Sequence, residues 1–153
     1  METTQLKSTI AQIIQSAQDF LPGYLADPVD MTMSGGNVSI CIVDENGQVY
    51  GTMWGSDPIR RRITFQTAWR KASQVWITGI ATGAFEEMVY SHRIDDAKFG
   101  IMKPEFIGWE GGWPAVIADG FRIAVAVSGM RGEKDTALVI EVVTAAGGTI
   151  TRS

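Results

Sequence analysis

The sequence has one cysteine, Cys41, and one histidine, His92, among 153 residues. A lone cysteine cannot form an intramolecular disulfide, which fits a reducing compartment. A lone histidine does not make a metal site, and no spacing typical of zinc ligands surrounds it. The sequence therefore predicts neither a disulfide framework nor a bound metal.

Long apolar runs and basic clusters are also scarce. No run approaches the roughly 18 residues of a membrane-spanning helix, and the N-terminal segment METTQLKST lacks the apolar core of a signal peptide. The net charge is −4, and the one basic cluster, Arg60, Arg61 and Arg62, is too short for a nucleic-acid footprint. P-loop and nucleophile-elbow patterns are absent as well. We therefore expect a cytoplasmic protein whose partners are neither membranes nor nucleic acids.

What is present is a composition typical of globular proteins, with 45% hydrophobic and 20% charged residues. The length fits a single domain over residues 1–153. Apolar residues at helical and alternating spacing predict helix, two strands, helix, irregular region, two strands and helix, over residues 4–21, 38–43, 48–53, 61–78, 91–113, 113–118, 121–127 and 133–146. This order predicts an α+β fold built on an antiparallel sheet.

Several local features refine this order. Pro22-Gly23 is expected to end the first helix, so that residues 24–37 form an irregular, loosely packed connection. Thr82 is expected to cap a short helix over residues 84–90. Residues 149–153 are expected to form a tail.

Turn residues and strand periodicity predict two hairpins. Asp44-Glu45-Asn46-Gly47 and Asp119-Gly120 each separate two apolar runs, which is typical of hairpin turns. Cys41 is expected to be a small buried residue on the face opposite to Ile40 and Ile42. The inward stripe of the second long helix is expected to contain Ala68, Ala72, Val75, Trp76 and Ile80.

Four segments follow one another in an order typical of one protein family. VSICIVDENG (38–47) is an apolar strand followed by D-x-x-G, and ITFQTAWRKA (63–72) is a helix with a Lys-Ala pair, Lys71-Ala72. GGWP (111–114) matches a G-G-x-P loop, and FRIAVAVSGMRGEKD (121–135) is similar to an ending with V-S-G-x-x-x-x-x-D. On these segments the chain resembles the GlcG/HbpS-like family, which includes the C-terminal domain of PduO.

The resemblance implies an antiparallel sheet of about five strands flanked by helices, as in profilin and the roadblock proteins, and frequent homo-oligomers. It also implies a place beside catabolic pathways for glycolate or diols, and haem binding in some members. Haem-binding relatives carry an axial histidine on the N-terminal helix, whereas this helix contains none. The adenosyltransferase domain of full-length PduO is absent, so cobalamin adenosylation is not implied.

The irregular region carries the first group of candidate site residues. His92 is the natural general acid/base or ligand-contacting residue because an imidazole titrates near neutrality. Arg93 could hold a carboxylate through a bidentate pair, or be an exposed partner of a neighbouring aspartate. Glu105 is a candidate ligand-binding carboxylate and a candidate base. For His92, a solvated position in a loop is the competing interpretation.

The glycine-rich loop that follows carries the second group. Trp109 and Trp113 flank Glu110, Gly111 and Gly112, and large rings in loops cover either flat ligands or subunit interfaces. Glu110 is a candidate catalytic base if indoles shield it from water, because desolvation raises a carboxyl pKa. Trp109, Gly111, Gly112 and Trp113 are therefore predicted to bind ligand.

These residues lead to one main hypothesis and two alternatives. The main hypothesis is a homo-oligomeric small-molecule pocket protein of a catabolic pathway, without a cofactor. It would act as an isomerase, hydratase or lyase on a small organic acid or aromatic compound, using His92, Glu110 and Arg93. The first alternative is a haem-binding or redox-sensing module, and the second is a non-catalytic oligomeric interaction protein.

Overall fold

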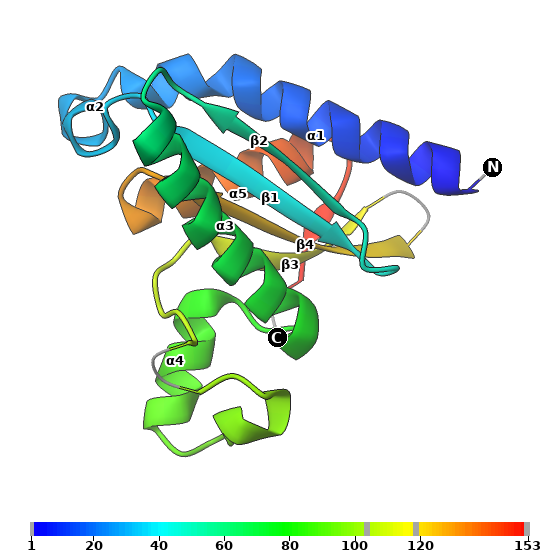
Figure 1. Ribbon diagram of the computed structural model, residues 1–153. Coiled ribbons are helices and arrows are strands. Elements are labelled where there is room, and N and C mark those ends of the chain that lie inside the picture. Colours follow the sequence, from blue (N-terminus) through cyan, green and yellow to red (C-terminus); the bar gives the residue numbers. More distant parts are fainter. Residues whose placement is uncertain (1, 103–104, 118–119, 152–153) are drawn as a thin grey trace.

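The elements form a five-stranded antiparallel sheet with strand order β2-β1-β4-β3-β5 and helices on both faces (Figure 1). The structure is a computed structural model that describes residues 2–102, 105–117 and 120–151. Its elements are α1 (Glu2–Leu25), α2 (Pro28–Ser34), β1 (Val38–Asp44), β2 (Val49–Trp54), α3 (Pro58–Thr78), α4 (Thr82–Tyr90), the 3-10 helix η1 (Asp96–Phe99), β3 (Gly112–Ile117), β4 (Phe121–Ser128), α5 (Gly132–Ala145) and β5 (Thr149–Ile150). The predicted α+β fold with an antiparallel sheet of five strands is confirmed.

The central strand β1 separates two apolar layers because its side chains alternate between the faces of the sheet. Val38, Ile40 and Ile42 join the larger core that α1 and α5 cover. Cys41 and Val43 point to the smaller core under α3. Cys41 is fully buried, as expected, and burial raises the pKa of its thiol to about 12. A thiol in this environment is a packing residue and a poor nucleophile.

The prediction that Pro22-Gly23 ends the first helix is wrong. α1 continues to Leu25, and the Ala26 amide still donates to the Pro22 carbonyl at 3.1 Å. The last turn is held from outside the helix, because the Tyr24 hydroxyl donates to Glu141 at 2.9 Å and Leu25 packs against the core. Tertiary contacts therefore offset the loss of the backbone hydrogen bond that a proline cannot make.

The expected irregular connection over residues 24–37 contains a short helix, α2. Asp27 caps it by accepting from the Val29 amide at 2.9 Å, and Pro28 occupies its first turn. α3 begins in the same way three residues before the expected start, with Asp57 as the cap and Pro58 following. The connection is also well packed, since Asp30 and Ser34 are fully buried.

Three further details differ from expectation. Trp76 lies at the edge of the inner face of α3 and is 48% exposed, while Lys71 and Gln74 are buried there instead. Thr82 lies inside α4 and donates to the Trp109 carbonyl rather than capping the helix. The segment expected to be a tail contributes β5, which pairs with β3 through Ala115 and Ile150.

The second hairpin is partly outside the described residues, because Asp119 is not among them. Gly120 has a φ of +89°, which suits a turn that needs the left-handed region. On either side of it, β3 and β4 pair in register from Ile117↔Phe121 to Gly112↔Ala126. The strands on either side of the turn are therefore those that the sequence predicts.

Candidate functional site

His92 and Arg93 line a surface cavity of about 970 Å³ below the end of α4. In Figure 1 this part of the chain projects below the sheet, beside the C-terminal half of α3. The walls come from the end of α4, from η1 and from the segment that follows η1. The lining residues are Val89, Tyr90, His92, Arg93, Ile94, Asp95, Asp96, Lys98, Phe99, Met102 and Phe106.

His92 occupies a backbone position that usually belongs to glycine. The Arg93 amide donates to the Met88 carbonyl at 2.9 Å, and the His92 amide donates to the Val89 carbonyl at 3.1 Å. This is the hydrogen-bond pattern of a Schellman motif, whose residue after the helix cap adopts the left-handed conformation. His92 has a φ of 59° and is the non-glycine residue with positive φ among those described. Backbone strain at an exposed cavity residue points to a use for its side chain.

Arg93 already has partners within this segment. Its guanidinium forms an ion pair with Glu87 and donates from Nε to the Ser91 hydroxyl at 3.0 Å. The ion pair is exposed on both sides, so it stabilises the fold little and can exchange for another anion. Asp95, one of the two neighbouring aspartates considered as an exposed partner of Arg93, caps η1 by accepting from the Ala97 amide.

The second group of predicted site residues lies elsewhere. Glu105, Trp109, Glu110 and Trp113 are not among the residues that line the His92 cavity. Glu105, Trp109 and Glu110 are exposed, and Trp109 keeps 67% of its surface accessible. The indoles therefore do not shield Glu110 from water, which was the condition for its assignment as a base.

Glu110 lies between the beginnings of two helices. A Cβ added at Gly83, near the start of α4, would lie 3.5 Å from Glu110 Cγ, and one added at Gly132, the first residue of α5, would lie 3.2 Å from Glu110 Cβ. Neither helix has a side-chain N-cap hydrogen bond. A carboxylate at this place is favoured by the positive ends of both helix dipoles, which gives Glu110 a structural role.

Gly111 and Gly112 cover a buried ion pair that the sequence interpretation missed. Lys71 of α3 lies 3.3 Å from the Asp135 carboxylate of α5, and its ammonium also donates to the Val127 carbonyl at 2.9 Å. Gly111 has a φ of +114°, and a Cβ there would lie 2.7 Å from the Val127 carbonyl oxygen and 3.0 Å from Lys71 Nζ. Only glycine allows the loop to lie this close.

Burial dominates the titration of this pair. It raises the pKa of Asp135 to about 7, although Lys71 and the Met130 amide, which donates to the carboxylate at 3.1 Å, act in the opposite direction. The same burial lowers the pKa of Lys71, against the pull of Asp135. Both side chains are almost inaccessible, with 2% and 3% exposed, so the pair connects the loop to the core rather than facing a ligand.

Trp113 also has a structural position. It packs against the larger core while its indole Nε1 donates to the Thr136 hydroxyl of α5 at 3.3 Å. Of the two tryptophans expected to bind ligand, Trp109 is thus the one that presents a large exposed surface. Trp113 instead connects β3 to α5.

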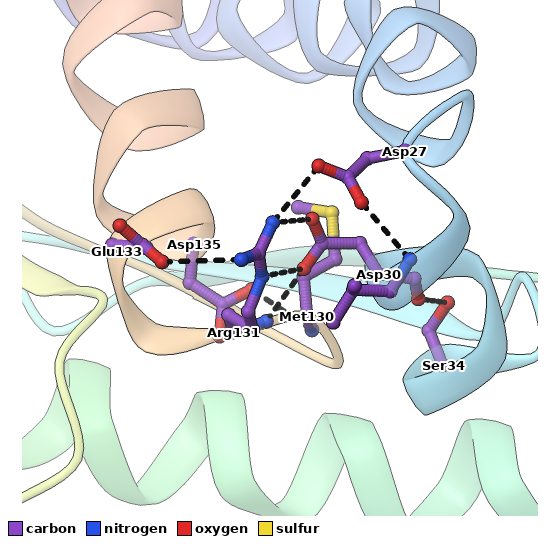
Figure 2. Close-up of polar contacts among 8 residues, drawn as sticks. Asp27, Asp30, Ser34, Met130, Arg131, Glu133 and Asp135 are labelled. Atoms are coloured by element: carbon purple, nitrogen blue, oxygen red, sulfur yellow. Dashed lines mark hydrogen bonds and ion pairs between the residues drawn. The ribbon is translucent and has the colours of Figure 1, made fainter.

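A second polar cluster joins α2 to the start of α5 (Figure 2). Arg131 forms a bidentate pair with Asp30, through Nε at 3.2 Å and a terminal nitrogen at 2.9 Å, and reaches Asp27 at 2.9 Å. The Arg131 amide also donates to Asp30 at 3.0 Å. These bonds lower the pKa of the fully buried Asp30. Among the described residues, no group of three or more His, Cys, Asp or Glu side chains could hold a metal ion.

Membrane insertion by a helix has no support in the described part of the chain, where no helix is both long and apolar enough to cross a bilayer. The two buried or partly buried polar clusters described above join α3 to α5 and α2 to the start of α5.

Comparison with known proteins places the chain in a family. The family model described as "Haem degrading protein HbpS-like" matches residues 29–144. No curated protein matches the chain.

Solved structures support the same fold. The chain is similar to HbpS, with 19% identity over 90% of this chain and 86% of that chain and a TM-score of 0.60. It is similar to the protein in a PduOC:heme complex, with 18% identity, 91% of each chain covered and a TM-score of 0.61. Protein ORFY of Klebsiella pneumoniae gives 17% identity, coverage of 92% and 88%, and a TM-score of 0.61. Because the family model spans more than half of the sequence, the chain belongs to the HbpS-like family.

Proposed function

We propose that this protein binds haem in the cavity at the end of α4, with the imidazole of His92 as the iron ligand. The observation that carries the proposal is the position of His92, the one histidine of the sequence, on an exposed cavity and in a strained backbone conformation. The family description and the haem complex of the related PduO domain support the choice of ligand.

The size and lining of the cavity suit a flat apolar ligand. Its volume of about 970 Å³ lies in the range of small-molecule and cofactor sites. Most of its wall is apolar or aromatic, with Phe99 and Phe106 each packing edge-on against Phe85. Rings held in this way offer firm surfaces for a porphyrin.

The donor set also suits haem iron. Imidazole nitrogen is a common axial ligand, and the thioether of Met102, which lines the same cavity, is another. Haem would supply an iron centre for electron transfer or for binding small ligands. Because α1 contains no histidine, the ligand position differs from the one that the family resemblance implies.

The charged residues of the cavity divide into two cations and two anions. Arg93 and Lys98 are suited to hold the propionates of haem, and the exposed pair of Arg93 with Glu87 exchanges at little cost. Asp95 and Asp96 also line the cavity, and their carboxylates would repel the propionates. We expect the propionates to lie on the side of Arg93 and Lys98.

Titration of the purified protein with ferric haem tests the proposal. The wild-type protein is expected to give a saturable Soret band at one haem per chain, and His92→Ala is expected to remove or shift that band. Glu110→Ala is the control, because Glu110 does not line the cavity. The proposal is wrong if His92→Ala, folded by circular dichroism, binds haem with the wild-type affinity and spectrum.

The main hypothesis from the sequence, a cofactor-independent isomerase, hydratase or lyase, has less support. Its three catalytic residues do not converge, because Glu110 does not line the cavity of His92 and Arg93. A proton-transfer reaction needs its acid and base within hydrogen-bond reach of one substrate. The enzymatic reading therefore stays a prediction without a supporting contact.

A further inference from the structure

A second hollow lies between the last turns of α3 and the strands β3 and β4. Its volume is about 450 Å³, within the range of small-molecule sites. Figure 1 shows α3 crossing this face of the sheet, with β3 and β4 beside its C-terminal half. Among the described residues, none lines both this hollow and the His92 cavity. The hollow is therefore a candidate site that does not depend on haem binding.

The floor of the hollow is apolar, as the register of β3 and β4 dictates. Pro114 pairs with Ala124, and Val116 pairs with Arg122. Residues directly opposite each other project from the same face of a sheet, and all four line the hollow. The short side chains of Pro114 and Ala124 leave space above the strands. Beside this apolar floor stands Arg122, which is exposed to solvent.

The wall of the hollow is an indole that the fold holds in place. Trp76 Nε1 donates to the Asp44 carbonyl at 2.9 Å, and a Cβ added at Gly47 would lie 3.8 Å from Trp76 Cζ2. The ring is thus fixed against the turn between β1 and β2, while Trp76 stays partly exposed and lines the hollow. A fixed aromatic surface beside an apolar floor suits an apolar or aromatic group.

Two opposite charges line the hollow without forming an ion pair. β1 and β4 pair up to Asp44↔Ile123, so Glu45 and Arg122 are neighbours just beyond this last pair. In the described part of the chain, neither side chain has a hydrogen bond or an ion pair. Both are exposed and both line the hollow. A ligand that carries both charges would therefore find a partner for each.

The end of α3 adds to the negative potential at the hollow. Gly79, which caps α3 after Thr78, is one of the lining residues. The last turn of α3 contains no basic residue, so no side chain of that turn neutralises the negative end of the helix dipole. Together with Glu45, this end favours an ammonium group. Arg122 is suited to a carboxylate, which a guanidinium can hold through two parallel hydrogen bonds.

We propose that this hollow binds a free α-amino acid with an apolar or aromatic side chain. Arg122 holds the carboxylate, Glu45 and the end of α3 hold the ammonium group, and the side chain lies on the apolar floor beside Trp76. A simple carboxylic acid would leave Glu45 unpaired beside a like charge, and a simple amine would do the same to Arg122. A zwitterion matches both charges.

Calorimetric titration of the full chain with L-phenylalanine and two truncated analogues tests the proposal. The analogues are 3-phenylpropionate, which lacks the ammonium group, and phenethylamine, which lacks the carboxylate. The wild-type protein is expected to bind phenylalanine with a Kd of about 1 mM or below. Each analogue is expected to bind about 10-fold more weakly, because each loses a hydrogen bond to a charged group.

Two variants assign each charge of the ligand to its partner. Arg122→Gln is expected to weaken phenylalanine binding by about 10-fold without weakening the binding of phenethylamine. Glu45→Gln is expected to weaken phenylalanine binding by about the same factor without weakening the binding of 3-phenylpropionate. Arg62→Gln is the matched control, because Arg62 is also exposed but does not line this hollow. The control should bind phenylalanine as the wild-type protein does.

Tryptophan fluorescence reports where the ligand lies. Phenylalanine is expected to change the emission of the wild-type protein, and Trp76→Phe is expected to lose that change while it still binds phenylalanine by calorimetry. The haem titration of Arg122→Gln should match the wild-type result, which separates this proposal from the preceding one.

Three results would overturn the amino-acid site. The first is an absence of phenylalanine binding to the wild-type protein at about 10 mM ligand. The second is binding that both Arg122→Gln and Glu45→Gln leave unchanged, because the ligand would then lie elsewhere. The third is an analogue that binds as tightly as phenylalanine, because a single charge would then be enough for recognition.

Discussion

His92→Gly is expected to stabilise the fold and at the same time to remove haem binding. The φ of His92 is 59°, in the left-handed region, where a side chain costs about 1–2 kcal/mol and glycine costs nothing. Part of this stabilisation, roughly 0.5–1 kcal/mol, is offset because glycine makes the unfolded chain more flexible and so loses more conformational entropy on folding. The net increase in unfolding free energy is therefore about 1 kcal/mol.

Thermal and urea denaturation of three variants at this position measure the effect. His92→Gly is expected to raise the melting temperature by roughly 2–4 °C. His92→Asn is expected to stay near the wild-type value, because asparagine tolerates the left-handed region. His92→Ala should be the least stable of the three. All three should lose the wild-type Soret band.

The reasoning fails if His92→Gly and His92→Ala unfold at the same urea concentration, because strain at this residue would then be absent. It also fails if His92→Gly keeps full haem affinity, because the imidazole would then not be the iron ligand. If the left-handed backbone at His92 is retained because the imidazole binds ligand, His92→Gly should be more stable than the wild-type protein and should not bind haem.

The remaining predictions concern the buried pair and the loop above it. Lys71→Met is expected to cost about 3–5 kcal/mol of unfolding free energy at pH 8, where Asp135 is left charged and buried, and clearly less at pH 5; equal costs would contradict this. Because the pKa of Asp135 is raised from 3.8 to about 7, folded Asp135 keeps a proton that the unfolded chain releases. The contribution of protonated Asp135 to the unfolding free energy is therefore complete below pH 4 and is lost as the pH rises to 7, by up to about 1.4 kcal/mol per pH unit. Urea midpoints measured across this pH range should show the slope, and Asp135→Asn should remove it. Gly111→Ala is expected to cost more than about 2 kcal/mol, because its Cβ would lie 2.7 Å from the Val127 carbonyl, whereas Gly79→Ala, with a φ of +72° and nothing within 4 Å, should cost about 1 kcal/mol.

Four of the five strands, β1 to β4, were predictable because local patterns determine them. The apolar alternation around Cys41, the Asp44-to-Gly47 turn and the run from Phe121 to Val127 each specify a strand or hairpin within a few residues. Burial later confirmed the assignment of Cys41 to the face opposite Ile40 and Ile42. Such features need no knowledge of distant parts of the chain.

Two helix starts could have been predicted from a signal that the interpretation overlooked. Asp27-Pro28 and Asp57-Pro58 both place a capping carboxylate before a proline in the first turn, which is typical of a helix start. The continuation of α1 past Pro22 had no such local signal. It depends on a hydrogen bond from Tyr24 to Glu141, 117 residues away.

The site was less predictable, because nearness in sequence was a poor guide to nearness in space. His92 and Glu110 are separated by one irregular region, yet Glu110 does not line the cavity of His92. Lys71 and Asp135 lie 64 residues apart and meet at 3.3 Å. Both belong to segments on which the family resemblance was based, but their convergence under Gly111 becomes visible only in three dimensions.

The burial of β1 has a consequence for the newly made chain on the ribosome. β1 is buried along its whole length, and its inner neighbour β4 ends at Ser128. At about 5–20 residues per second, synthesis leaves several seconds between the appearance of β1 and that of β4. During this time a strongly apolar strand has only the short hairpin with β2, so nascent chains are expected to need protection from aggregation until the last third of the protein has been made.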